Sequence, residues 1–131
     1  MNKQPESKKR NRTQMRTKVF ECVYQFLINP DSEVSLEFDY EKETFGGVVQ
    51  NIEKLKGIVA KFSVGFELER IYKVDLSILL LAVYELLYSG DVPSEVAIDQ
   101  ALELSKLYST EKSTAFINGV LASVYKQKHQ K

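Results

Sequence analysis

The chain has 131 residues, of which 44% are hydrophobic and 27% are charged, as in a single globular domain that can bury a core. One cysteine excludes an intrachain disulfide and a cysteine metal cluster, and one histidine argues against a Ser-His or Cys-His catalytic site. The formal net charge is zero, so the total charge alone indicates no charged partner.

Basic charge is concentrated at the two ends of the chain. Residues 1–18 carry seven Lys or Arg and one acidic residue, a net charge of +6. Residues 19–125 carry eight basic and seventeen acidic residues, a net charge of −9, and residues 126–131 add three lysines. If the fold brings the two ends together, they form one positive patch that favours a polyanion by Coulomb attraction and counterion release. The alternative is a pair of solvated tails that keep the protein in solution.

The elements expected in the first half of the chain are helices. Residues 1–11 are polar and lack periodicity, which predicts a disordered basic tail. A helix is predicted from Thr13 to Ile28, because apolar residues recur there at three- and four-residue steps and Pro30 ends the pattern. A second long helix is predicted from Tyr40 to Phe62, in which the Gly46-Gly47 pair permits close packing.

The second half of the chain predicts three further helices and one short helical piece. The short piece is expected around Phe66–Ile71. The segment Val74–Tyr88 is apolar nearly all round, which predicts the central, buried helix. Pro93 is expected in the first turn of a helix that reaches Tyr108, and the last helix is expected at Glu111–Lys126.

No segment alternates like a strand for long, which predicts an all-α bundle of about six to seven helices. Residues 12–126 are expected to form one helical domain, followed by a basic tail at 127–131. The most apolar run, Leu76–Tyr88, spans 13 residues, well short of the ~20 that cross a bilayer. The basic N-terminus lacks the apolar stretch of a signal peptide, so we expect a cytoplasmic protein.

The first predicted helix carries a possible RNA-binding flank. Arg16, Phe20 and Tyr24 follow one another at four-residue intervals along this flank, and Lys9, Arg10 and Arg12 precede them. Guanidinium groups can pair with phosphate, and aromatic faces can stack on unpaired bases. The alternative is that Phe20 is buried against another helix and that Arg16 is an ordinary surface residue.

The last predicted helix contains the segment Phe116-Ile117-Asn118-Gly119-Val120-Leu121, in which Asn118 and Gly119 are poor interior helix residues. Phe116 lies about a quarter turn from the apolar stripe on a helical wheel, and Asn118 lies on the outer side. An asparagine amide can read a base edge, and Gly119 would let a neighbouring backbone approach. The alternative is a local helix irregularity in which Phe116 belongs to the core.

Catalysis has no credible set of residues in the sequence. Asp75 and Glu85 lie ~15 Å apart by helical rise, too far for a catalytic pair of carboxylates. We expect Glu85 to cap a helix or to form a pair inside the bundle. The Gly46-Gly47 pair is not followed by the Gly-Lys-Ser/Thr of a phosphate-binding loop. We therefore expect no enzyme, no cofactor and no metal site.

Several short motifs follow one another at a distinctive spacing in the chain. These motifs are Val74-Asp75, Ala82-Val83-Tyr84-Glu85-Leu86-Leu87, Val92-Pro93, Val96-Ala97-Ile98 and Phe116-Ile117-Asn118-Gly119-Val120-Leu121. In the first half of the chain, Arg12, Arg16, Val23-Tyr24-Gln25 and Gly47-Val48 belong to the same pattern. By the order and spacing of these motifs, residues Arg12–Tyr125 resemble the family of the bacterial transcription antitermination factor NusB.

The resemblance implies an all-helical fold of two packed sub-bundles and a role in transcription. Members of the family bind the boxA element of ribosomal RNA leader transcripts together with NusE, a small-subunit ribosomal protein. The complex joins RNA polymerase and suppresses premature termination. By this resemblance, the candidate RNA-binding residues are Arg12, Arg16, Tyr24, Asp75, Phe116 and Asn118.

The chain departs from the family in its arginine pattern. Family members often have a denser arginine cluster where this chain has Thr13-Gln14-Met15, and arginines where it has Leu76 and Leu80. This thinning favours an alternative function, a helical protein-interaction module, able to form a homodimer, with little or no RNA binding. The basic residues around the first helix favour RNA.

Overall fold

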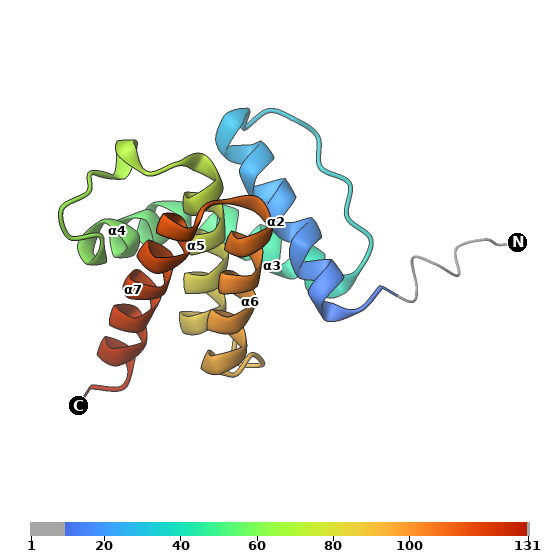
Figure 1. Ribbon diagram of the computed structural model, residues 1–131. Helices are drawn as coiled ribbons and strands as arrows, with labels where there is room; N and C mark the ends of the chain where they lie inside the picture. Colours follow the sequence, from blue (N-terminus) through green and yellow to red (C-terminus); the bar gives the residue numbers. More distant parts are fainter. Residues whose placement is uncertain (1–9, 131) are drawn as a thin grey trace, which may run out of the picture.

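The structure, a computed structural model, describes residues 10–130 and is all-helical within that range, which confirms the predicted fold class (Figure 1). Its six α-helices are α2 (Arg12–Ile28), α3 (Asp39–Gln50), α4 (Ile52–Phe62), α5 (Lys73–Leu87), α6 (Ser94–Tyr108) and α7 (Glu111–Lys128). A single-turn 3-10 helix, η1 (Leu68–Arg70), lies between α4 and α5. Most of the predicted N-terminal tail, residues 1–9, lies outside the described residues.

Helix α5 is the centre of the bundle, as its apolar sequence predicted. Eleven of its 15 residues are buried, and it packs against α2, α3, α4, α6 and α7 (Figure 1). Helices α2 and α3 pack together as one group, while α7 packs against both α4 and α6 in a second group. The two packed sub-bundles implied by the family resemblance therefore share α5 as their common helix.

The core is aliphatic and is built from one stripe of each helix. Seven aliphatic residues of the helices around α5 have no exposed surface, namely Val19, Val23, Val48, Leu55, Val59, Ile117 and Leu121. Each such side chain contributes roughly 1.5–3 kcal/mol when it is removed from water. The predicted apolar stripes of the first and last helices therefore hold the bundle together.

The predicted long helix from Tyr40 to Phe62 is wrong, because the chain forms two helices that meet at Asn51. The Asn51 side-chain amide donates a hydrogen bond of 2.8 Å to the Gly47 carbonyl, and the backbone at Asn51 leaves the helical region. Asparagine side chains compete in this way with regular helix hydrogen bonds. The break lets α3 pack on α2 and α5 while α4 packs on α5 and α7.

Gly47 provides the close packing that we predicted for the glycine pair. A Cβ atom at Gly47 would overlap the hydroxyl end of the Tyr84 ring, so any larger residue displaces that ring. Gly46 has open space around it and contributes no such contact. Tyr84 in turn stacks on Tyr88, with ring centroids 5.8 Å apart and planes 19° apart.

The helix ends follow local sequence signals. Asn11, which we assigned to the tail, caps α2 through a reciprocal pair of hydrogen bonds with Gln14. Pro93 is the cap residue of α6 and therefore lies one position before the first turn that we predicted. Thr110 caps α7, because its side-chain oxygen accepts the Ser113 backbone N–H at 3.0 Å.

The described ends of the chain, residues 10 and 130, lie on opposite sides of the molecule (Figure 1). Whether the two basic ends form one positive patch stays a prediction, because residues 1–9 and 131 lie outside the described residues. No helix between residues 10 and 130 is long and apolar enough to span a membrane. The same residues include no group of three or more His, Cys, Asp or Glu side chains placed to hold a metal ion.

Candidate RNA-binding interface

The predicted RNA-binding residues form two groups in the structure. The first group, on α2 and just before it, comprises Arg10, Arg12, Arg16, Phe20 and Tyr24. The second group, on α5 and α7, comprises Asp75, Phe116 and Asn118. Lys9 lies outside the described residues.

Arg16 is buried, so its guanidinium is not exposed to a phosphate as our prediction requires, and its contact with RNA stays a prediction. Arg16 is 4% exposed, and its Nε and Nη2 donate hydrogen bonds of 2.8 and 3.1 Å to the two carboxylate oxygens of Glu85. Burial alone would lower the pKa of Arg16, but the hydrogen bond and charge of Glu85 outweigh burial and raise it. Arg16 is therefore a permanent cation that joins α2 to α5, and the expected pairing of Glu85 inside the bundle is confirmed.

Tyr40 connects this buried pair to the surface. Its hydroxyl donates a hydrogen bond of 2.5 Å to Glu85, and burial followed by the Glu85 charge raises its pKa. The guanidinium of Arg12 lies over the Tyr40 ring, 4.1 Å from the centroid. Arg12 is exposed, and no carboxylate within residues 10–130 lies within 4 Å of it. The guanidinium of Arg12 is therefore positioned by the Tyr40 ring and has no carboxylate partner within the described residues, so its N–H groups can bind a phosphate.

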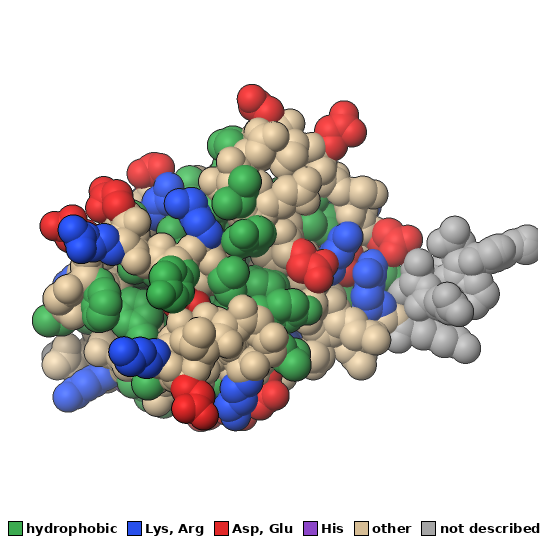
Figure 2. Space-filling model, turned by 45° about the horizontal axis from the view of Figure 1, so that its top comes forward, with side chains coloured by type: hydrophobic (Ala, Val, Ile, Leu, Met, Phe, Trp, Pro, Cys, Tyr) green, Lys and Arg blue, Asp and Glu red, His purple; other side chains and the backbone are tan. Residues whose placement is uncertain are grey.

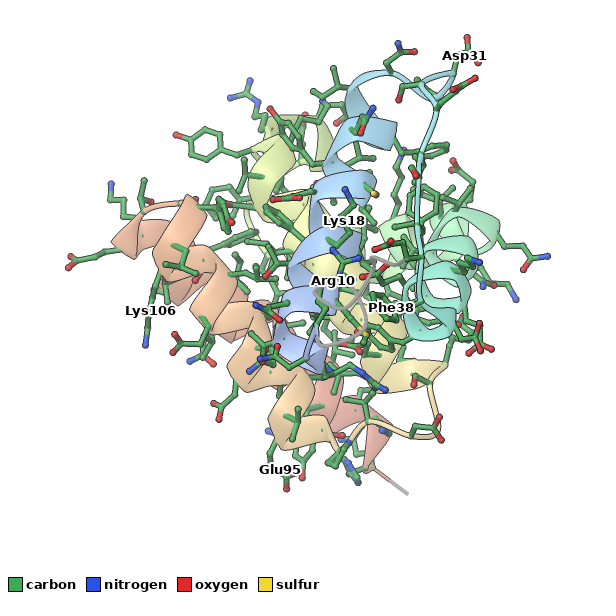
Figure 3. The ribbon with its side chains drawn as sticks, turned by 90° about the vertical axis from the view of Figure 1, so that its right-hand side faces the viewer. Arg10, Lys18, Asp31, Phe38, Glu95 and Lys106 are labelled. Atoms are coloured by element: carbon green, nitrogen blue, oxygen red, sulfur yellow. The ribbon has the colours of Figure 1, made fainter. Side chains whose placement is uncertain are left out.

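Arg10 is engaged by acidic residues at the start of α3. It donates a hydrogen bond of 2.8 Å to Glu37, and its Nε lies 3.2 Å from the buried Glu41 carboxylate without hydrogen-bond alignment. Its guanidinium also lies 5.0 Å from the Phe38 ring centroid, beside α2 (Figure 3). Sequence reasoning missed Glu41 as a partner, because nothing in the local pattern places residue 41 next to residue 10.

Phe20 is buried, so our prediction that its ring face is open to a base is wrong. It is 4% exposed, and its ring packs against Tyr108 of α6 with centroids 5.1 Å apart. Tyr24, one helical turn further along α2, is 37% exposed. Ile28 on α2 and Leu107 and Tyr108 on α6 are exposed as well, and we call the surface that carries these four apolar residues the α2–α6 face. Hydrophobic side chains gather on the side of the molecule turned to the viewer in Figure 2.

Asp75 is buried beneath the junction of α6 and α7, so its carboxylate is not exposed as an RNA contact would require, and the contact that the resemblance implied stays a prediction. The two carboxylate oxygens of Asp75 accept hydrogen bonds from the Ser109 hydroxyl at 2.7 Å and from the Ser113 hydroxyl at 2.6 Å. Asp75 is only 4% exposed. Its role in this conformation is to join the start of α5 to the start of α7.

Phe116 lines a cavity of about 690 Å³ between η1, the start of α5 and the start of α7. Its ring is half-buried and meets Phe66 edge-on, with centroids 4.9 Å apart and planes at 62°. Part of the Phe116 ring packs on the core, as one prediction had it, and part of it lines an open cavity, as a position off the apolar stripe allows.

Asn118 is exposed on α7, in agreement with its predicted outer position. Gly119 is exposed as well, and a Cβ atom there would meet nothing within 4 Å. Our prediction that Gly119 lets a neighbouring backbone approach is therefore wrong.

Arg70 and Lys112 also line the cavity beside Phe116, and sequence reasoning missed both. They belong to η1 and α7, which are separated by about 40 residues of sequence and have no shared periodicity. No local signal could have brought them together, since only the packing of α5 against α7 places the two segments side by side.

The sequence model of the NusB family matches residues 13–126. The chain belongs to the NusB family. The match covers all six helices almost completely, which confirms the resemblance carried by the short motifs.

Several curated relatives are described as transcription antitermination protein NusB. The protein of Acetivibrio thermocellus is 49% identical over 90 residues, which are 69% of this chain and 62% of that protein, less than two thirds of its length. The protein of Clostridium perfringens is 45% identical over 81% of this chain and 79% of its own length. That of Listeria innocua is 36% identical over 86% of this chain and 94% of its own length.

Solved structures show the same fold. The structure of T. maritima NusB has a TM-score of 0.81 and 32% identity, and covers 91% of this chain and 93% of that one. A chain from a crystal structure of the antitermination factors NusB and NusE in complex with dsRNA has a TM-score of 0.78 at 23% identity, over 88% of this chain and 96% of that one. At that identity the second likeness concerns the fold alone.

Proposed function

We propose that this protein is a transcription antitermination factor that binds boxA-like RNA of ribosomal RNA leader transcripts together with NusE and associates with RNA polymerase. The family match across residues 13–126 is the observation that carries the proposal. The named relatives and the complex of NusB, NusE and dsRNA with the same fold support it. In this proposal the protein binds RNA and NusE and catalyses no reaction, and it acts in the cytoplasm.

Arg12 is the residue of α2 that supports phosphate binding best. Its guanidinium is exposed, stacked on Tyr40 and free of carboxylates within the described residues. A planar guanidinium held in this way presents its donors to a phosphate with little loss of conformational entropy. Arg10 and Lys9 directly precede it in the chain and add positive charge there, provided that RNA displaces Arg10 from Glu37.

Phe116 and Asn118 support a second contact with RNA, in which bases rather than phosphates are recognised. Neither residue carries charge. Asn118 exposes its amide on α7, and Phe116 exposes part of its ring in the cavity beside the start of α7. An aromatic ring can stack on an unpaired base, and an amide can read a base edge that phosphate contacts cannot distinguish.

The α2–α6 face supports binding to a protein partner, for which we propose NusE. Its exposed apolar residues, Tyr24, Ile28, Leu107 and Tyr108, are 37%, 56%, 73% and 46% exposed. Exposed apolar side chains that gather on one surface are typical of a protein-binding site, and the contact between Phe20 and Tyr108 joins α2 to α6 here. The same face also favours the second function, a protein-interaction module with little RNA binding, because the burial of Arg16 removes one cation from the RNA side.

A gel-shift assay separates these two functions. Labelled boxA-like RNA and a scrambled RNA of the same composition are titrated with the protein, each with and without NusE. We expect tight, salt-sensitive binding of the boxA-like RNA that is strengthened by NusE, since a joint surface adds contacts that neither protein has alone. Binding of NusE with no RNA shift under any of these conditions would establish the protein-interaction module instead.

A further inference from the structure

Two arginines at the start of α2 have similar aromatic contacts with the start of α3. Arg10 lies over the Phe38 ring, 5.0 Å from its centroid, and Arg12 lies over the Tyr40 ring, 4.1 Å from its centroid. Arg10 precedes Arg12 by two residues, as Phe38 precedes Tyr40, so one alignment of the two segments produces both contacts. The two guanidinium groups differ in their anionic partners, because only that of Arg10 is paired with carboxylates within residues 10–130.

We propose that Glu37, Phe38 and Glu41 form an acidic site that competes with RNA for Arg10 and thereby lowers the affinity of the protein for RNA. The inference rests on the proposed RNA-binding function and adds an internal competitor to it. In the acidic site, Arg10 donates a hydrogen bond of 2.8 Å to Glu37, and its Nε lies 3.2 Å from the Glu41 carboxylate. A phosphate that binds Arg10 has to replace both carboxylates.

The two segments that meet at the acidic site have complementary charges. Residues 1–10 carry four basic residues and one acidic residue, a net charge of +3. Residues 37–43 carry four acidic residues and one basic residue, a net charge of −3. Carboxylate and phosphate are alternative anions for the same guanidinium group. The charge that attracts RNA to the start of the chain therefore also favours this internal partner.

The contact of Arg10 with the acidic site is attractive but imperfect. The Arg10 Nε and one carboxylate oxygen of Glu41 are buried, and neither makes a hydrogen bond within the described residues. Buried polar atoms without a hydrogen bond disfavour the state that contains them. The Arg10 and Glu37 side chains are 24% and 46% exposed, and an exposed ion pair shifts an equilibrium by at most about fivefold. A phosphate that aligns its oxygens with the guanidinium can therefore displace the carboxylates.

Both helix starts keep their own caps when Arg10 leaves the acidic site. Arg10 precedes α2, whose cap is the reciprocal pair of hydrogen bonds between Asn11 and Gln14. Glu41 accepts two backbone N–H groups at the start of α3, at 3.1 and 3.3 Å, through its other carboxylate oxygen. Neither cap involves Arg10, so its release unwinds neither helix. The alternative is a structural ion pair that stays closed when RNA binds.

The experiment uses the full-length chain with NusE and a fluorescein-labelled single-stranded boxA-like RNA, titrated at several salt concentrations. The variant Glu37→Gln/Glu41→Gln removes both carboxylates of the acidic site. Glutamine at position 41 keeps a side-chain oxygen for the cap of α3. Thermal melts check that each variant is folded. Glu37→Gln alone, at an exposed residue, replaces the double variant if that variant unfolds.

The matched control is Asp39→Asn/Glu43→Gln. It removes two exposed acidic charges from the same segment, and both residues line a hollow that also contains Arg12. Neither of these carboxylates lies within 4 Å of Arg10. Each pair of replacements is made in the wild type and in Arg10→Gln, which gives a double-mutant cycle. The rate of trypsin cleavage after Arg10, measured by mass spectrometry without RNA, reports separately how firmly the acidic site holds this residue.

We expect Glu37→Gln/Glu41→Gln to bind the RNA roughly three- to tenfold more tightly than the wild type, and Glu37→Gln alone up to about fivefold more tightly. The salt slope should become steeper by up to ~0.7, because Arg10 can then contact one phosphate. In the Arg10→Gln background, the same replacements should change the affinity no more than the control does. Trypsin should cleave after Arg10 faster in Glu37→Gln/Glu41→Gln than in the wild type or the control.

An equal gain in the control, or a gain that persists in Arg10→Gln, would overturn this inference, because the effect would then be one of total charge. Unchanged trypsin cleavage would show that the carboxylates do not hold Arg10. Faster cleavage without tighter RNA binding would overturn the competition and leave the proposed function standing. If the wild type bound no RNA with NusE present, the proposed function would fail, and the competition with it.

Discussion

Replacing Arg16 should unfold the protein more readily while leaving the RNA-binding chemistry of the folded state intact. Arg16→Met removes both hydrogen bonds to Glu85, a residue that is itself 1% exposed. The Glu85 carboxylate would then be left in the interior with the Tyr40 hydroxyl as its remaining donor. Breaking a buried ion pair in this way costs about 3–5 kcal/mol of the free energy of unfolding.

Two control variants test the reasoning behind this magnitude. Arg16→Met/Glu85→Leu removes both charges, and replacing a buried pair by apolar groups is often nearly neutral. Much of the lost stability should therefore return, although Tyr40 loses its acceptor. Arg12→Met, at an exposed position, should change the free energy of unfolding by less than about 1 kcal/mol, the scale of an exposed cation–π contact.

Urea unfolding followed by circular dichroism gives the stabilities, and RNA titration below the unfolding transition gives the affinities. We expect Arg16→Met to lower the free energy of unfolding without changing the salt slope of RNA binding. Arg12→Met should lower the salt slope and leave the free energy of unfolding nearly unchanged. An Arg16→Met protein that kept wild-type stability but bound RNA with a lower salt slope would refute the assignment of Arg16 as a structural cation.

Three further predictions concern packing, pH and specificity. Gly47→Ala should lower the free energy of unfolding by about 1 kcal/mol or more because it displaces the stacked Tyr84 ring, whereas Gly46→Ala, in open space, should raise it by up to ~1 kcal/mol; urea unfolding of the pair compares them directly. Because burial and Glu85 raise the pKa of Tyr40 above its unfolded value of about 10, its contribution to stability is complete below that pH and is lost above it. Wild type should therefore lose stability between pH 10 and pH 11 more steeply than Tyr40→Phe, by up to ~1.4 kcal/mol per pH unit, and equal slopes in urea unfolding would contradict this. Asn118→Ala, at an exposed position, should narrow the difference in affinity between boxA-like and scrambled RNA at unchanged melting temperature; an unchanged difference would exclude Asn118 from base recognition.

The fold was predictable wherever burial depends on one helix's own periodicity. The segment from Val74 to Tyr88 is apolar on all sides, and that alone indicates a helix surrounded by others. The break at Asn51 was not predictable in the same way, because asparagine is tolerated inside helices. Its effect depends on α3 and α4 having different packing partners, and only the tertiary structure specifies these.

The candidate site was less predictable, because a helical wheel gives the direction of a side chain but not its partner. Arg16 lies at the edge of the apolar stripe of α2, an edge that an arginine can occupy in water or against another helix. The Glu85 carboxylate, which binds Arg16 inside the bundle, lies 69 residues away in sequence. The burial of Asp75 was unpredictable for the same reason, because its hydrogen-bond partners Ser109 and Ser113 follow it by 34 and 38 residues.

These internal partners change what the net charge of the N-terminal segment means for RNA binding. Residues 1–18 carry a net charge of +6, but Arg16 is neutralised inside the bundle and Arg10 is paired with Glu37 and Glu41. Arg12 is the free, exposed cation among the described residues that we place on RNA. One phosphate contact on a single strand predicts a salt slope of magnitude about 0.7.

A steeper slope would assign further contacts to the chain before Arg10. Lys3, Lys8 and Lys9 would raise its magnitude to about 3 if each bound one phosphate. Replacing these three lysines with glutamine and repeating the salt titration measures their share directly. A slope near ~2 that the triple replacement left unchanged would require two further cations, which Arg10 and Arg16 could supply by leaving their carboxylate partners when RNA binds. In that case the interface would form by rearrangement of the ion pairs described here.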